Sequence, residues 1–363
     1  MTMLEKRVML CLGSGGVGKT TVAAAMALAL ASHGERVVVL TIDPARRLAD
    51  ALGLQAEDVS PRRSSGNTIE EVKTPDGRIW ATMLDPAATF EGVIREETTS
   101  EEKANRILDN PLFHNLARSL SGTNEYMAAE RLHQLYNDPR FDRVIVDTPP
   151  SRHALDFLDS PQRLSRFINH RLYRSVFAPR SGLLRTVSAG SQIILRLLGR
   201  LVGSRLVDDV VTFFASFEGL DAGFDRRSTE ITRVLEQDTA FALVTSARRG
   251  PLDEAAWIAG NVVTRLGRDD AIDALIVNRL CPVDPRTEVG SDMAEPLALN
   301  LAQLVTVAAQ EEALVNNFND GLSHRPQTIR LFEQHQPVSD LPGLHRLAET
   351  LARHLDPGTV AES

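Results

Sequence analysis

The chain has 363 residues, of which 43% are hydrophobic and 24% charged, and its formal net charge is −8. This length accommodates one large α/β domain or two moderate ones. The negative charge argues against a nucleic-acid partner bound through bulk charge, and no run of about 18 uncharged apolar residues could span a bilayer. The N-terminus leads into a predicted strand without a signal peptide, so we expect a cytoplasmic protein, with a position peripheral to the membrane as the alternative.

The first predicted strand, Val8 to Leu12, leads into a glycine-rich loop that fits the phosphate-binding pattern G-x-x-x-x-G-K-[ST]. An alanine-rich helix is predicted to follow from Lys19 to Ser32. In this geometry the glycines let the backbone approach phosphates, and the helix N-terminus directs N–H groups at them. Lys19 would contact the β- and γ-phosphates, and the Thr20 hydroxyl would bind Mg²⁺. The predicted nucleotide-binding residues here are Gly13, Ser14, Gly15, Gly16, Val17, Gly18, Lys19, Thr20 and Thr21.

Further strands and helices alternate along the chain. Strands are predicted at 36–42, 79–85, 144–146, 240–245, 274–277 and, at an edge, 327–332, and helices at 46–54, 253–266 and 344–355. This alternation predicts an α/β fold with a doubly wound, mostly parallel sheet. We expect a single domain over 1–363, with helical insertions at about 86–137 and 152–237.

Three predicted strands end in polar side chains, Asp43, Asp147 and Asn278. Ligands of open α/β sheets bind at the carboxyl ends of the strands. Asp147, after Val144 to Val146, suits the role of holding a Mg²⁺ shell, which leaves Asp43 to orient or deprotonate an attacking water. A helix cap is the structural alternative for Asp43, because Pro44 follows it.

Four segments in order carry a family resemblance: GSGGVGKTT at 13–21, TIDPARRLADALGL at 41–54, DTPPSRHALDFLDSP at 147–161 and IVNRL at 276–280. Together they resemble the ArsA-type ATPases, which have a deviant Walker A loop. This family includes arsenite-pump ATPases and the ATPases that deliver tail-anchored membrane proteins. The resemblance implies ATP hydrolysis with Mg²⁺, and a dimer whose helical subdomains open and close with nucleotide.

The resemblance also implies residue roles. Asp43 would activate the hydrolytic water, with Lys19 as the second catalytic residue, and Thr20, Asp43 and Asp147 would surround the metal. Asn278 would read adenine, together with a loop at Ser339 to Gly343, and Arg279 is a further predicted nucleotide-binding residue. Asp147 and His153 match the family's D-T-A-P-T-G-H segment, whereas Arg152 replaces its glycine.

Three departures from the family pattern affect function. The family's loop usually carries a lysine at the position of Ser14, and that lysine reaches the partner subunit's phosphates, which a short uncharged serine does not do. The CxxC zinc pair of some relatives is missing, since Cys281 stands alone. Cys11 and Cys281 offer no thiol triad, which disfavours binding of thiophilic arsenite, and we expect two buried thiols.

The segment Ser160–Val207 contains nine arginines and no acidic residue. Within it, 181–203 has a basic stripe on one side and apolar residues on the other at helical spacing. One interpretation is a core helix of the insertion with a solvated basic face. The other is a groove for a hydrophobic client helix, or a contact with anionic lipid.

Two functional hypotheses follow from these residues. The first is an ATPase that works as a dimeric conformational switch, handling a hydrophobic or membrane-protein client. The second, motivated by Ser14, is a weakly active nucleotide-binding subunit that completes a heterodimer with a lysine-bearing paralogue. The sequence leaves homodimer and heterodimer open.

Overall fold

The computed structural model describes residues 3–42, 47–52, 67–74, 77–110, 123–149, 155–169, 220–290, 293–335, 338 and 340–355. Its close contacts divide the chain into two compact units. Unit 1 comprises Met1–Leu84, Gln134–Leu155 and Val234–Ser363, and unit 2 comprises Asp85–His133 and Asp156–Arg233. The organisation as one domain with inserted helices remains a prediction.

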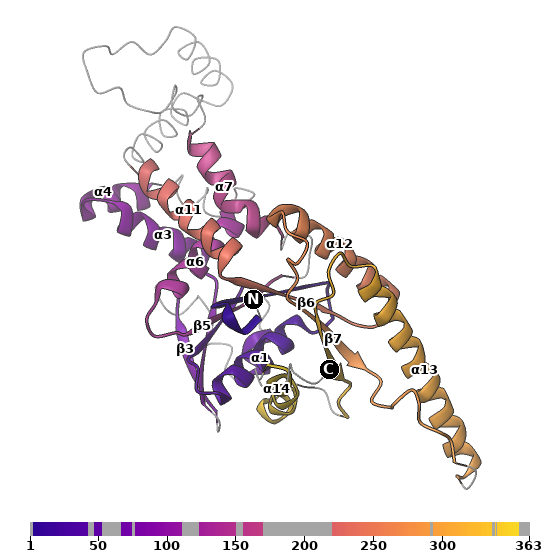
Figure 1. Ribbon diagram of the computed structural model, residues 1–363. Coiled ribbons are helices and arrows are strands. Elements are labelled where there is room, and N and C mark those ends of the chain that lie inside the picture. Colours follow the sequence, from indigo (N-terminus) through magenta and orange to yellow (C-terminus); the bar gives the residue numbers. More distant parts are fainter. Residues whose placement is uncertain are drawn as a thin grey trace, which may run out of the picture. The chain divides into compact units, whose positions relative to one another are not determined.

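Unit 1 is built on one eight-stranded sheet with the order β3-β4-β2-β5-β1-β6-β7-β8, in which only β3 and β4 pair antiparallel (Figure 1). This confirms the predicted α/β class and the edge position of the last strand. The strands are β1 Val8–Gly13, β2 Val37–Thr41, β3 Ile69–Thr74, β4 Gly77–Met83, β5 Arg143–Asp147, β6 Thr239–Thr245, β7 Ala274–Leu280 and β8 Gln327–Phe332.

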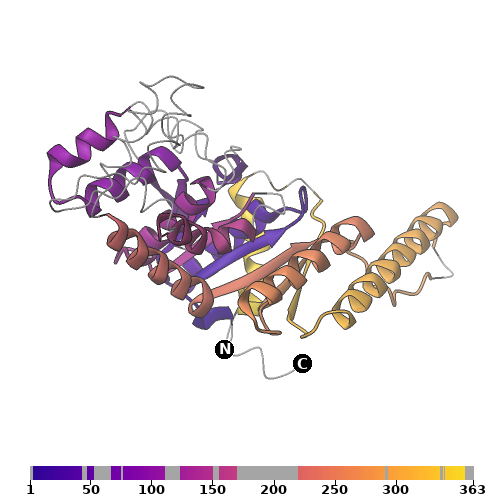
Figure 2. The ribbon, with the colours of Figure 1, turned by 90° about the horizontal axis from the view of Figure 1, so that it is seen from above.

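Helices cover both faces of this sheet. The helices of unit 1 are α1 Lys19–Ser32, α2 Arg47–Ala51, α12 Arg249–Leu266, α13 Glu295–Asp320 and α14 Leu341–Leu355, after a short 3-10 helix, η1, at Met3–Glu5. On one face α1 and α14 lie side by side and share a buried cluster with alternate residues of the strands (Figure 1). The buried residues of α12 stay outside that cluster although α12 contacts β1 and β6, so α12 covers the other face (Figure 2).

The α1 helix has the predicted bounds, and its alanines explain its place. Helix α1 is buried along almost its whole length, and its alanine side chains allow it to lie close to the sheet. Strand β3 and helix α13 were missed from sequence. Strand β3 has only two apolar residues, Ile69 and Val72, among its six, and α13 has no clear apolar stripe.

Unit 2 is helical in the part that the structure describes. Its helices are α3 Pro86–Glu97, α4 Glu101–Leu108, α6 Thr123–Asn137, α7 Asp156–Asn169 and α11 Asp221–Gln237, of which the last turns of α6 and α11 count with unit 1. Asp85 and Ser100 cap α3 and α4 by accepting hydrogen bonds from Ala88 N–H and Lys103 N–H.

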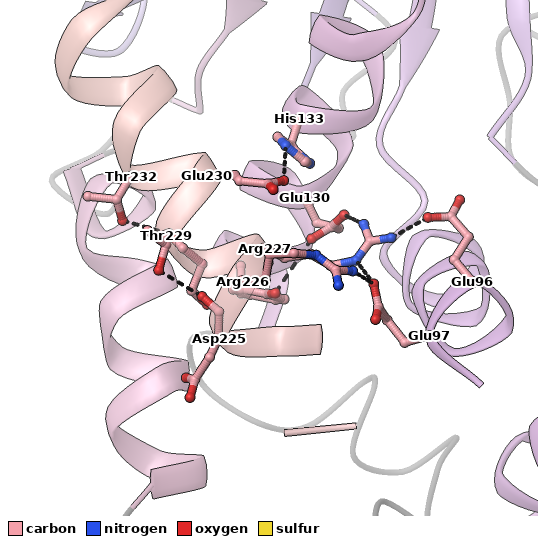
Figure 3. Close-up of polar contacts among 12 residues, drawn as sticks. Glu96, Glu97, Glu130, His133, Asp225, Arg226, Arg227, Thr229, Glu230 and Thr232 are labelled. Atoms are coloured by element: carbon pink, nitrogen blue, oxygen red, sulfur yellow. Dashed lines mark hydrogen bonds and ion pairs between the residues drawn. The ribbon is translucent and has the colours of Figure 1, made fainter. Parts of the chain in front are cut away.

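An arginine from α11 lies buried among carboxylates of unit 2 (Figure 3). Arg227 forms ion pairs with Glu96, Glu97 and Glu130, and the Arg227 Nε–Glu97 Oε1 distance is 2.7 Å. Burial raises the pKa of Glu130, and the nearby Arg227 guanidinium opposes that shift. Gly223 makes room for this arrangement, because a Cβ there would lie 2.1 Å from Glu97 Oε2. The cluster therefore joins α3, α6 and α11.

The imidazole of His133 gives unit 2 a predicted pH dependence. Burial lowers the pKa of His133 below 6.5, although Glu230, 3.2 Å from its Nε2, opposes the shift. The imidazole therefore takes up a proton near pH 6.5 in the unfolded chain, but only at lower pH in the folded chain. The contribution of His133 to the free energy of unfolding is present above pH 6.5 and is lost as pH falls. We expect urea unfolding to show a smaller loss of stability from about pH 7 to 5 in His133→Gln than in the wild type. The exposed His324→Gln should retain the wild-type slope, and equal slopes in all three proteins would contradict the prediction.

Candidate functional site

The glycine-rich loop connects β1 to α1 at the carboxyl edge of the sheet, where the central strands β2, β5, β1 and β6 end together. Gly13 lies against β6, and a Cβ at Gly13 would be 2.1 Å from the carbonyl oxygen of Val244. Gly16 and Gly18 have φ of 78° and 95°, in the left-handed region that favours glycine. The loop thus exposes backbone at the N-terminus of α1, whose first N–H groups have no partner within the helix.

Lys19 lies inside this loop. Its side chain is buried, and its Nζ donates to the carbonyl oxygens of Gly13 and Ser14 at 3.0 and 2.9 Å. The ammonium is thereby held at the centre of the loop backbone. The chain has only three other lysines, at 6, 73 and 103, and a compact ammonium suits a phosphate cradle better than the planar guanidinium of arginine.

Asp147 ends β5 beside β1, in register with Cys11 of β1 and Thr41 of β2. Its Oδ2 accepts hydrogen bonds from Thr20 Oγ1 at 2.8 Å and from Thr41 Oγ1 at 3.1 Å. The structure therefore brings the predicted pair Thr20 and Asp147 together, although they are 127 positions apart. Sequence reasoning missed Thr41, whose hydroxyl helps to orient the same carboxylate.

The donor set at Thr20 and Asp147 fits Mg²⁺. Mg²⁺ is commonly held by one or two protein oxygens, with substrate phosphates and waters completing an octahedral shell. A hydroxyl and a carboxylate oxygen in contact at the mouth of a phosphate loop provide this kind of set. In the part of the chain that the structure describes, no three His, Cys, Asp or Glu side chains gather into a larger metal-binding group.

Ser14 is buried, with 4% of its surface exposed. Among the described residues its Oγ has no hydrogen-bond partner. A buried hydroxyl without a partner in the protein is uncommon. The hydroxyl is available to a ligand in the loop, but it carries no charge.

Asn278 supports the loop from β7. Its Nδ2 donates to the Val17 carbonyl at 2.8 Å, and its Oδ1 accepts from Arg279 N–H at 3.0 Å. Arg279 is exposed and has a φ of 61°. Asn278 thus contacts the loop backbone from 261 positions away, a bracing contact that sequence reasoning missed because an adenine-reading role was expected.

The structure describes some of the remaining predicted residues and not others. Val17 is buried, whereas Gly15 is exposed and Thr21 is half-buried. Asp340 and Gly343 form the start of α14, because Asp340 Oδ1 accepts from Gly343 N–H at 2.9 Å, so 341–343 are helical and not the expected loop. The predicted roles of Asp43, Arg152, His153, Ser339 and 181–203 lie outside the described residues.

A cavity of about 480 Å³ opens where β7 and β8 end. None of the predicted site residues that the structure describes lines it.

Both cysteines are unpaired thiols and both are buried, as expected. Cys11 lies in β1. Its burial and, to a smaller extent, the negative charge of Asp147 raise the pKa of its thiol. No helix in the described ranges combines the length and apolar character needed to cross a membrane.

Replacing Gly18 by alanine should damage the loop. The new Cβ would lie 2.4 Å from Asn278 Nδ2, and an alanine at φ 95° is strained by roughly 1–2 kcal/mol. We expect nucleotide affinity to fall roughly tenfold or more, measured by calorimetric titration. The control is Gly260→Ala in α12, where a Cβ meets nothing within 4 Å. Equal affinity in both variants would contradict this prediction.

Comparison with known proteins finds one matching family and several related ATPases. The sequence model of the family described as "Anion-transporting ATPase" matches residues 6–293. A "Putative arsenical pump-driving ATPase 2" of Aquifex aeolicus is 24% identical over 281 residues, covering 76% of this chain and 81% of that protein. "ATPase GET3" of Malassezia globosa is 28% identical over 156 residues, 43% of each chain.

A third relative, the "Arsenical pump-driving ATPase" of Escherichia coli, is 30% identical over 169 residues, 43% of this chain and 26% of that protein. The match thus spans less than half the length of the GET3 and Escherichia coli relatives. The resemblance predicted from four short segments is confirmed over most of the chain: this protein belongs to the ArsA family of anion-transporting ATPases.

Proposed function

We propose that this protein hydrolyses ATP with Mg²⁺ and works as a dimeric conformational switch. The observation that carries the proposal is the junction of Lys19, Thr20 and Asp147 at the mouth of the glycine-rich loop, where Thr20 Oγ1 and Asp147 Oδ2 are 2.8 Å apart. In phosphoryl transfer an ammonium contacts the phosphates, and a hydroxyl and a carboxylate hold Mg²⁺; these three side chains would supply those groups.

In the proposed mechanism, loop backbone N–H groups and the N-terminus of α1 bind the phosphates. Lys19 turns from the carbonyls of Gly13 and Ser14 to the β- and γ-phosphates and neutralises the charge that develops there. Thr20 and Asp147 would hold Mg²⁺, which would supply positive charge that offsets the charge of the phosphates. Asn278 holds the loop in shape through Val17.

Asp43 would orient the attacking water and accept its proton. The support is its place in the chain, directly after Ile42, whose N–H donates to the Asp147 carbonyl at 3.0 Å. Arg279, exposed beside the loop, would contact the base together with Asn278. Client handling is assigned to the arginine-rich segment 160–207, on the grounds of its sequence alone.

The second candidate function is a weakly active subunit of a heterodimer. The observation that favours it is Ser14, a buried hydroxyl at the position where the family usually has a charged side chain. The positive charge that the family's lysine supplies at this position would then have to come from a different chain of the dimer.

The test is ATP binding and turnover by the purified full chain, with and without Mg²⁺, for the wild type and Ser14→Lys. We expect Mg²⁺-dependent binding and slow turnover in the wild type, and faster turnover in Ser14→Lys. Ser32→Lys, at the exposed C-terminal end of α1, is the matched control and should behave as the wild type. Absence of ATP binding would refute the ATPase, and full turnover by the wild type alone would dispose of the obligate heterodimer.

A further inference from the structure

The carboxyl end of β6 lies beside the start of the phosphate loop. Strand β6 pairs parallel with β1 in a register that sets Val244 opposite Gly13, and the two residues are in close contact. The chain that leaves β6 therefore continues next to Ser14. Residues 245–247 are buried there, and Arg248 is the first exposed residue after them.

Arg248 has a fixed backbone. It is the N-cap residue of α12: its N–H donates to the Ser246 carbonyl at 2.7 Å, and its own carbonyl accepts from Leu252 N–H at 3.0 Å. Its guanidinium has no hydrogen-bond or ion-pair partner among the residues that the structure describes. A cation is thus held at the edge of the sheet where the phosphate loop lies, and it is available to an anion.

The spacing along α12 distinguishes Arg248 from its neighbour Arg249. Arg248 precedes the buried Leu252 and Ala255 by four and seven positions, so it lies in line with the stripe that packs on the sheet, where α12 contacts β1 and β6. Arg249 lies about 120° from the centre of that stripe, in line with the exposed Asp253. Arg248 therefore begins the sheet-facing side of α12, and it is exposed because β1 and β6 end there.

An arginine at this position is unfavourable for α12 itself. A helix N-terminus carries partial positive charge, which favours carboxylates and disfavours cations. The first turn of α12 has no acidic residue, and Arg248 makes no side-chain cap hydrogen bond of the kind that serine or aspartate would make. A negatively charged ligand beside Arg248 would offset both the charge of the side chain and that of the helix end.

We propose that Arg248 is a catalytic residue that contacts the γ-phosphate of ATP bound in the loop of its own chain. It supplies from β6 the positive charge that Ser14 does not supply from the loop. A planar guanidinium donates paired hydrogen bonds to phosphate oxygens and neutralises charge that develops during phosphoryl transfer. The inference rests on the proposed ATPase function, and it makes a lysine-bearing partner unnecessary.

In this hydrolysis Arg248 keeps its proton. The water oxygen bonds to the γ-phosphorus while the bond from that phosphorus to the β–γ bridging oxygen breaks. ADP leaves with the electron pair of the broken bond, and the proton of the water passes to Asp43. The guanidinium stabilises the charge on the equatorial oxygens of the transferred group.

The contacts of the loop favour the γ-phosphate over the base as the partner of Arg248. The ammonium of Lys19, which is expected on the β- and γ-phosphates, lies at the start of the loop. Asn278, the predicted adenine reader, meets the loop further along, at Val17. Strands β5 and β6 flank β1 on opposite sides, so Arg248 approaches the phosphates from the side away from Asp147.

The experiment compares the affinities of the full chain for a non-hydrolysable ATP analogue and for ADP, both with Mg²⁺, by calorimetric titration. Arg248→Gln should weaken binding of the analogue about tenfold or more and change ADP affinity less than about twofold. Arg249→Gln, the same change on the outward side of α12, is the matched control and should leave both affinities unchanged. An unchanged preference for the analogue in Arg248→Gln, or equal losses in the two variants, would overturn the proposal.

Turnover and thermal unfolding separate catalysis from a structural role. Arg248→Gln should lower ATP turnover on the order of 10²-fold. It should unfold at the wild-type temperature or above, because it removes a cation from a helix N-terminus. A lower unfolding temperature together with weaker ADP binding would mean that Arg248 supports the fold, and would overturn the catalytic assignment.

A mixing experiment tests whether Arg248 acts on the loop of its own chain. An equimolar mixture of Arg248→Gln and Lys19→Ala should show no more turnover than the two variants measured separately. Recovery of turnover would assign Arg248 to the site of a second copy and overturn the proposal. A wild-type chain that binds no ATP analogue refutes the proposed function, whereas a wild-type preference for the analogue that persists in Arg248→Gln refutes this inference alone.

Discussion

Replacing Lys19 by alanine should lower ATP turnover by on the order of 10²–10³-fold. The Nζ of Lys19 is held inside the loop by two carbonyls, at 3.0 Å from Gly13 O and 2.9 Å from Ser14 O. It is therefore already in place to move to the phosphates without a rearrangement of the chain. Alanine removes the only lysine of the loop, and with it the charge that would be closest to the transferred phosphoryl group. Single-turnover kinetics with Mg²⁺ and ATP measure the effect.

The control for this experiment is Lys73→Ala. Lys73 is an exposed lysine of the edge strand β3, so it shares the charge of Lys19 but not its place. We expect wild-type turnover from Lys73→Ala and an unchanged thermal unfolding profile. Wild-type turnover from Lys19→Ala would mean that the loop does not carry the hydrolytic site.

Replacing Arg227 by methionine should destabilise the helices of unit 2 by roughly 3–5 kcal/mol. Methionine keeps the apolar volume of the side chain but leaves Glu130, which has no exposed side-chain surface, without its ion-pair partner. Glu97, also nearly buried, loses one of its two arginines. An uncompensated buried carboxylate is costly, and Glu130 would respond by taking up a proton. Hydrogen exchange of the amides of α3, α6 and α11 measures the loss without assuming that both units unfold together.

The neighbouring Arg226→Met is a matched control for that variant. Arg226 pairs with the same Glu97 at 2.8 Å, but its side chain is 61% exposed, so its removal should cost less than about 1 kcal/mol. The destabilisation by Arg227→Met should also shrink as pH falls, because a protonated Glu130 needs no cation. Equal effects of the two variants at neutral pH would show that burial does not govern the cluster.

The elements that sequence predicted well are those whose pattern is local. The loop from Gly13 to Thr21 has a motif that fixes backbone chemistry within nine residues, and α1 begins and ends where the alanine-rich segment does. The buried strands β1, β2, β5 and β6 are continuous apolar runs, which is typical of parallel strands covered on both faces. Their alternation with helices was sufficient to predict the sheet.

The elements that were missed depend on partners elsewhere in the chain. Strand β3 is recognisable only from its antiparallel pairing with β4, since its own pattern is largely polar. Helix α13 has apolar residues all round, and neither its length nor its exposed half follows from periodicity. Arg227 and its three glutamates lie up to 131 positions apart and come together only through the packing of α3, α6 and α11.

By itself the sequence determined the fold class, the family and the phosphate loop, because each depends on short segments whose residues set the conformation of their own backbone. Only the tertiary structure decided that Thr41 shares the Asp147 carboxylate with Thr20 and that Asn278 holds the loop through Val17. Those contacts are made where neighbouring parallel strands end at one edge, and strand order, which sets these neighbours, is decided by packing of the whole sheet.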